Sequence, residues 1–175
     1  MKVALDRRRA RWRWHVALAE TLAASGSAVA VRSDTTATHS EDVCSASLKG
    51  LLLLERTLAG RERAWLCDTL PAADDERFLS TAAGLSDADI IINLGATPCL
   101  ADDTHHVRTL TPTFDGLVGD VAFWNTLLDG RAPLLGVIDS HTGANTPLSL
   151  PALETPHRLL ESSEAVLTHL VAALD

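Results

Sequence analysis

The sequence predicts an α/β fold whose sheet is mostly parallel and doubly wound, with helices on both faces. Short apolar stretches alternate along the chain with longer stretches in which apolar residues recur at helical spacing. The clearest strand candidate, DADIIINL at residues 87–94, has apolar residues on both faces, which is typical of a strand covered by helices on both sides. We therefore expect ligands to bind outside the carboxyl ends of the strands.

Residues 1–31 read as one β-α-β unit. An apolar strand is predicted at residues 3–5, an amphipathic helix at 14–24 and a second strand at 28–31. Gly26 follows the helix, at a position where helix C-termini favour glycine.

The middle of the chain continues the alternation. Residues 45–58 carry leucines along one helical face, and residues 64–66 form a brief apolar run that is typical of a strand. The polar segment 71–84 is expected to be helical in its second half, ahead of the strand at 87–94.

The last third predicts a second β-α-β unit, made of a strand at 108–110, a helix at 119–128 and a strand at 134–138. A loop rich in Thr, Pro, Ser and Asn is expected at 140–156. An amphipathic helix at 156–174 follows it.

Length and composition indicate a single globular domain over residues 1–175. The hydrophobic content is 46%, and the chain is long enough to bury one substantial core. The net charge of -8 disfavours nucleic acid as a partner, because such binding depends on a basic surface. Three separated cysteines predict neither a disulfide framework nor a zinc site, so a reducing cytoplasm is the simplest setting. No apolar run approaches the roughly 20 residues of a membrane helix, so no membrane partner is expected.

A basic loop follows the first predicted strand and leads into a helix N-terminus. Guanidinium groups and unpaired N–H groups at a helix start both attract anions, so this loop suits a phosphate or carboxylate of a small-molecule substrate. Its arginines are Arg7, Arg8, Arg9, Arg11 and Arg13. The alternative is a solvated basic turn with Trp12 and Trp14 packed beneath it.

Asn93 ends the best predicted strand, in the run INLGATP. Its amide there is suited to polarising a carbonyl or stabilising an oxyanion, and Gly95 would let a ligand or another backbone come close. Alternatively, Asn93 only caps the turn.

Two histidines lie in the run DDTHHVR at residues 102–108. His106 is a candidate general base, because a neutral imidazole accepts protons near neutral pH and a nearby carboxylate can orient it. The pair lacks helical spacing and a third ligand, so no metal site is predicted. The alternative is a pair of surface histidines ahead of a strand.

Asp139 and His141 lie in the run VIDSHTGAN, after the last predicted strand. A doubly wound sheet places catalytic loops at such positions. The alternative is a polar turn around Gly143. Ser140 stands in no GxSxG sequence, which argues against a hydrolase.

Several of these fragments together resemble the formyltransferase fold, a Rossmann-type α/β fold found in methionyl-tRNA and glycinamide ribonucleotide formyltransferases. The family's strand-loop run reads roughly N-x-H-P-S-L-L-P-x-Y-x-G, followed by a helix and a G-V strand. The matching residues here are Pro112, Phe114, Gly116, Phe123, Trp124, Gly130, Gly136 and Val137. MKVAL at the start of the chain and GSAVAV after the first helix are similar to the family's first unit, and DADIIINL is similar to its strand before the active site. The resemblance therefore covers most of the chain.

The resemblance implies a transferase in which a substrate amine attacks the formyl group of 10-formyltetrahydrofolate. The family's Asn and His hold and polarise the formyl carbonyl, and an Asp in a D-T-G triplet assists proton transfer. With Pro112 matched to the second proline of the run, the Asn and His positions fall on His105 and Val107, next to His106. The triplet similar to D-T-G is HTG at residues 141–143, close to Asp139.

The leading hypothesis is therefore a formyltransferase-like group transferase that acts on an amine of a small anionic or sugar-linked substrate. His106, Asp139, His141 and Asn93 would be catalytic, and Arg7, Arg8, Arg9, Arg11, Gly95 and Gly116 would bind substrate. Two alternatives are a catalytically inactive binding module of the same fold and a sugar-nucleotide-binding domain associated with glycosyl transfer.

Overall fold

A mixed, mostly parallel sheet forms the centre of the protein in a computed structural model, which describes residues 1–7, 12–33, 46–59, 64–68, 87–95 and 107–175. The strands that it contains are ordered β2-β1-β3-β4-β5-β6 across the sheet. The elements are β1 (Lys2–Arg7), α1 (Arg13–Ala24), β2 (Ala28–Ser33), α2 (Ala46–Ala59), β3 (Ile90–Asn93), β4 (Arg108–Phe114), α4 (Asp120–Leu128), β5 (Leu135–Asp139), β6 (Asn145–Ser149) and α5 (Leu159–Leu174).

The predicted first β-α-β unit is confirmed. β1 and β2 pair in parallel along their whole length, from Lys2 with Ala28 to Arg7 with Ser33. Gly26 has a φ of +92°, which a glycine adopts without strain, and it follows α1 as predicted. The strand predicted at 87–94 is also present, as the shorter β3, and it lies between β1 and β4.

The second predicted β-α-β unit is wrong, because β5 runs antiparallel to β4. The Asp115 amide donates to the Leu134 carbonyl at 2.9 Å, and the Leu134 amide donates to Asp115 Oδ1 at 2.7 Å. These bonds tie the start of β5 to the end of β4, so β5 must run back along it. α4 returns the chain to that same end of β4 instead of crossing the sheet.

Two other predicted elements differ from the structure. Residues 64–66 form part of a turn and not a strand: the Asp68 amide bonds the Trp65 carbonyl at 2.9 Å, and buried Trp65 and Cys67 account for the apolar signal. The predicted loop 140–156 contains β6, which pairs antiparallel with β5. Pro147 favoured the prediction of a loop, because proline is rare inside sheets, but an edge strand such as β6 tolerates it. The helix predicted within 71–84 lies outside the described residues.

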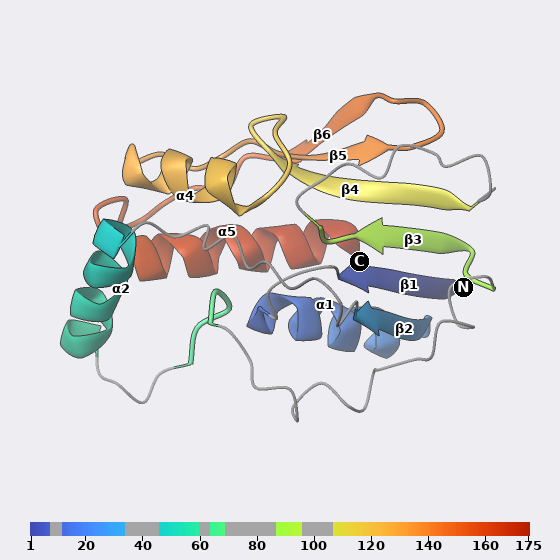
Figure 1. The fold of residues 1–175 in the computed structure, drawn as a ribbon, viewed down its shortest axis with the longest axis horizontal. Coiled ribbons are helices and arrows are strands. Elements are labelled where there is room, and N and C mark those ends of the chain that lie inside the picture. Colours follow the sequence, from blue (N-terminus) through green and yellow to red (C-terminus); the bar gives the residue numbers. More distant parts are fainter. Residues whose placement is uncertain (8–11, 34–45, 60–63, 69–86, 96–106) are drawn as a thin grey trace.

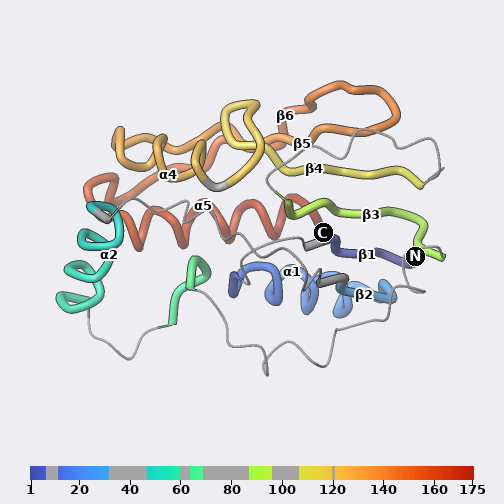
Figure 2. The backbone as a smooth tube through the Cα atoms, viewed as in Figure 1, coloured from blue at the N-terminus to red at the C-terminus, as the bar shows by residue number. Residues whose placement is uncertain are grey.

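The long helix α5 organises the packing of the helices. It contacts α1, α2 and α4, and Figure 2 shows it running between them. Its buried side chains recur at helical spacing and include Leu160, Val166, Leu167 and Leu170. These side chains join one buried hydrophobic cluster that also takes in β1, β3, β4 and β5.

Candidate functional site

The sheet has one apolar face and one polar face. Side chains alternate between the faces along each strand, and the strand register aligns equivalent positions. The apolar face carries Val3, Leu5, Val31, Ile92, Phe114 and Leu135, which are buried in the same cluster as apolar residues of α1, α2, α4 and α5. The other face, called the polar face, carries Asp6, Asn93, Thr109, Thr111, Thr113, Gly136 and Asn145 together with the apolar residues Ala4, Ile91 and Ile138. The described helices therefore all pack toward the apolar face.

Asn93 and Thr111 form the centre of the polar face. Asn93 Nδ2 donates to Thr111 Oγ1 at 3.2 Å, and Asn93 Oδ1 accepts the Gly95 amide at 3.0 Å. Both side chains are buried. Asp6, also buried, lies beside Asn93 in the register of β1 and β3. Asn93 thus caps the turn after β3, as one of the two readings of the sequence predicts, and also joins β3 to β4.

A pocket of about 230 Å³ opens farther along the same face, over β4, β5 and β6. Thr113 and Asn145 line it, and Thr113 Oγ1 donates to Asn145 Oδ1 at 3.2 Å. Gly136 lies beneath this pair. A Cβ on Gly136 would stand 2.7 Å from Asn145 Oδ1 and 2.8 Å from Thr113 Oγ1, so the close approach requires glycine. Thr113 and Gly136 are buried, so the exposed Asn145 amide is the polar group of the three that the pocket offers to a ligand.

Asp115 holds the wall of this pocket in place. Its φ of +53° marks a tight turn, and its carboxylate accepts hydrogen bonds from the Leu134 amide, Arg131 and Thr126. Partial burial opposes ionisation of this carboxyl, but the three hydrogen bonds outweigh it and lower its pKa. The carboxylate therefore acts as a structural anchor for the turn at Gly116.

Asp139 lies on the opposite face of the sheet from Asn93, and His141 lies in the turn after β5. Because β5 runs antiparallel, its carboxyl end lies beside the amino end of β4, where Asp139 accepts hydrogen bonds from Arg108 Nε and from the His141 amide, both at 2.9 Å. These hydrogen bonds lower the pKa of Asp139. Asp139 pairs with Leu110, and Leu110 pairs with Ile92, so Asn93 lies only one position farther along the strands. Successive side chains of a strand point to opposite faces, so Asn93 and Asp139 lie on different faces of the sheet. The structure therefore does not bring Asn93 and Asp139 into one group of contacts.

The other predicted site residues divide between described and undescribed positions. His106, Arg8, Arg9 and Arg11 lie outside the described residues, and Arg7 is the last residue of β1. Gly95 follows β3, and Gly116 borders the pocket at Thr113. At the start of α1, the Arg13 and Trp14 amides donate to the Asp68 and Leu66 carbonyls, so these two N–H groups are not available to an anion.

Sequence reasoning missed the threonines of β4 and Asn145. The signal was present in TLTPT at residues 109–113, where three hydroxyl side chains alternate with Leu110 and Pro112. Period-two alternation places the three hydroxyls on one face of a strand.

Comparison of the chain with protein-family models, curated protein sequences and solved structures gives no match. Within the described ranges, no three His, Cys, Asp or Glu side chains gather as a metal site requires. None of the helices described is long and apolar enough to cross a membrane.

Proposed function

We propose that the chain is a formyltransferase-like domain that binds a small polar ligand on the polar face of its sheet, with formyl transfer altered or lost. The threonine row of β4 carries this proposal. β4 continues through Pro112, so this proline can match the first proline of the family run N-x-H-P-S instead of the later one, a register that gives up the matches at Phe114 and Gly116. The family's Asn, His and Ser then fall on Thr109, Thr111 and Thr113.

In this register, threonines replace the family's Asn, His and Ser. The three family positions alternate along a strand, and the three threonines share the polar face in the same way. A threonine hydroxyl donates and accepts hydrogen bonds, but it does not take up a proton at neutral pH as a histidine does. The substitution therefore retains groups that bind a carbonyl and removes the acid-base group that formyl transfer uses.

The surrounding amides support a ligand with carbonyl, amide or hydroxyl groups. Asn93 lies beside the middle threonine of the row, Thr111, and exposed Asn145 lies beside Thr113 at the pocket. The proposal thus places the carbonyl, amide or hydroxyl groups of the ligand at the sheet and does not use the start of α1 as an anion site.

An active formyl transferase is the second candidate. It is favoured by the position of Asn93 at the carboxyl end of a central strand, where ligands of open α/β sheets bind. In this case His106 would accept the proton of the attacking amine, 10-formyltetrahydrofolate would donate the formyl group, and Arg7, Arg8, Arg9 and Arg11 would hold an anionic part of the substrate.

Calorimetric titration with 10-formyltetrahydrofolate, together with an absorbance assay of its deformylation in the presence of amines, distinguishes the candidates. Binding without turnover, weakened about tenfold by Thr113→Val, supports the binding domain; loss of one hydrogen bond of about 1 kcal/mol or slightly more accounts for this factor. Thr142→Val, in the exposed β5–β6 turn, is the matched control. Turnover that His106→Ala abolishes supports the transferase.

Two results would contradict both candidates. The first is that the folate does not bind. The second is that thermal stabilisation occurs with nucleotide sugars alone, which would favour the sugar-nucleotide-binding reading of the sequence.

A further inference from the structure

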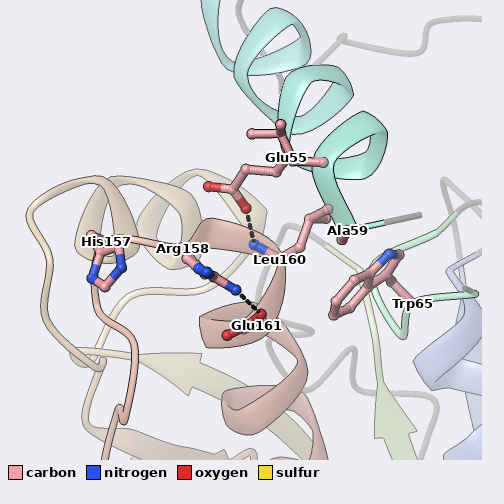
Figure 3. A pocket seen from close by; sticks show the side chains of 8 residues that line it. Glu55, Ala59, Trp65, His157, Arg158, Leu160 and Glu161 are labelled. Carbon is pink, nitrogen blue, oxygen red and sulfur yellow. Dashed lines mark hydrogen bonds and ion pairs between the residues drawn. The ribbon is translucent and has the colours of Figure 1, made fainter. Parts of the chain in front are cut away.

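A second pocket, of about 280 Å³, lies between the end of α2 and the start of α5. Leu58, Ala59, Trp65 and Leu160 form its apolar walls. In Figure 3 the Trp65 ring borders one side, opposite Arg158. A dry cavity of about 150 Å³ already accepts a benzene ring, so this pocket has room for a one-ring or two-ring ligand.

The two carboxylates of the pocket already have partners. Glu55 accepts the Leu159 and Leu160 amides through its two oxygens, each at 2.8 Å. Glu161 accepts Arg158 Nη1 and Thr155 Oγ1, also at 2.8 Å each. Glu161 is paired with the positive charge of Arg158, and Glu55 lies against the positive N-terminal end of the α5 dipole, which offsets part of its charge.

The spare hydrogen-bonding capacity belongs to donors. Among the described residues, the Arg158 guanidinium has one acceptor, Glu161, for its five N–H groups. His157, exposed at the mouth, adds a further N–H. A planar carboxylate matches the free edge of a guanidinium in a two-bond geometry.

We propose that this pocket binds a small aromatic carboxylate, with its ring against Trp65 and Leu160 and its carboxylate on Arg158 and His157. The apolar walls select the ring, and the unmatched donors at the mouth select the anion. This site is separate from the polar face of the sheet and does not depend on the function proposed for that face.

Titration with indole-3-carboxylate, with neutral indole and cationic tryptamine as comparison ligands, tests the proposal. The expected dissociation constant for indole-3-carboxylate is on the order of 0.1–1 mM, as befits a ligand of about twelve heavy atoms. The carboxylate should bind more tightly than indole, and tryptamine should bind most weakly. Binding should also shift the indole N–H resonance of Trp65 in two-dimensional NMR spectra, which locates the ligand.

Two variants test the pocket by independent means. Arg158→Met keeps the side-chain stem and removes the donors, so it should weaken carboxylate binding about tenfold and leave indole binding unchanged. Ala59→Phe fills the pocket and should abolish binding of both. Ala172→Phe, at an exposed position of α5, is the matched control and should bind like the wild type. Equal binding of the three ligands, no binding of the carboxylate, or a carboxylate affinity unaffected by Ala59→Phe would overturn the proposal.

Discussion

Replacement of Glu55 by alanine should destabilise the protein by removing a cap that one helix supplies to another. The Glu55 carboxylate, on α2, accepts the first two amides of α5. The N-cap residue of α5, Arg158, makes no side-chain capping bond. Without Glu55, the Leu159 and Leu160 amides therefore lose their acceptor, and the helix dipole loses a nearby negative charge.

The size of this effect follows from the geometry. Loss of a good N-cap costs about 0.5–2 kcal/mol, and two hydrogen bonds to one charged acceptor place Glu55→Ala near the upper end, at about 1–2 kcal/mol. Partial exposure of Glu55 keeps the figure below that of a buried charge pair. For a chain of this length, about 2–4 °C of melting temperature corresponds to each kcal/mol, so a decrease of about 2–8 °C is expected.

Urea unfolding followed by circular dichroism gives the free energy of unfolding directly. Glu55→Gln keeps an acceptor oxygen and should lose about half as much stability as Glu55→Ala. Glu154→Ala removes the same charge from an exposed residue shortly before α5, and should change the stability by less than about 0.5 kcal/mol. A loss for Glu55→Ala no larger than that for Glu154→Ala would refute the capping argument.

Three further predictions concern single residues. Gly136→Ala should cost about 1–3 kcal/mol in urea unfolding, because the new Cβ would overlap the pair of side chains above it, whereas Gly50→Ala, with open space around it in α2, should stabilise the protein by about 0.5–1 kcal/mol. Asp139 has a lowered pKa in the folded protein, so its contribution to stability is complete above the ordinary value of 3.8 and is lost as the pH falls through the lower folded pKa. In Asp139→Asn, the free energy of unfolding should therefore decrease less steeply as the pH is lowered through this range. Burial raises the pKa of Cys67 to about 11, so in a variant that lacks the other two cysteines an aromatic disulfide reagent at pH 8 should modify it at least about 100-fold faster in urea than in the folded protein.

Local sequence patterns were sufficient for most elements of the fold. Helical spacing of apolar residues located α1, α2, α4 and α5, and the run IIIN located β3. The direction of β5 was not accessible in this way, because it depends on the bonds between Asp115 and Leu134, 19 residues apart. β6 was missed because one proline and several polar residues describe an exposed edge strand as well as they describe a loop.

The candidate site was predictable only in part. Asn93 could be chosen because it ends a recognisable buried strand, and the structure places it in the polar face. Whether Asp139 lies near it depends on strand direction, which short-range patterns do not encode. The threonines of β4 were overlooked because threonine is common in strands for its branched Cβ, so its hydroxyl carries little signal until the neighbouring strands are known.

The antiparallel return of β5 also has a consequence for the order of folding. β4, α4, β5 and β6 are consecutive both along the chain and across the structure, so their contacts close short loops. β1 must instead meet β3 from a distance of more than 80 residues, as in the bond from the Asp89 amide to the Lys2 carbonyl. Because short loops close at lower entropic cost, we expect residues 108–149 to become protected first in pulse-labelled hydrogen exchange, and the N-terminal strands to join a template that is already formed.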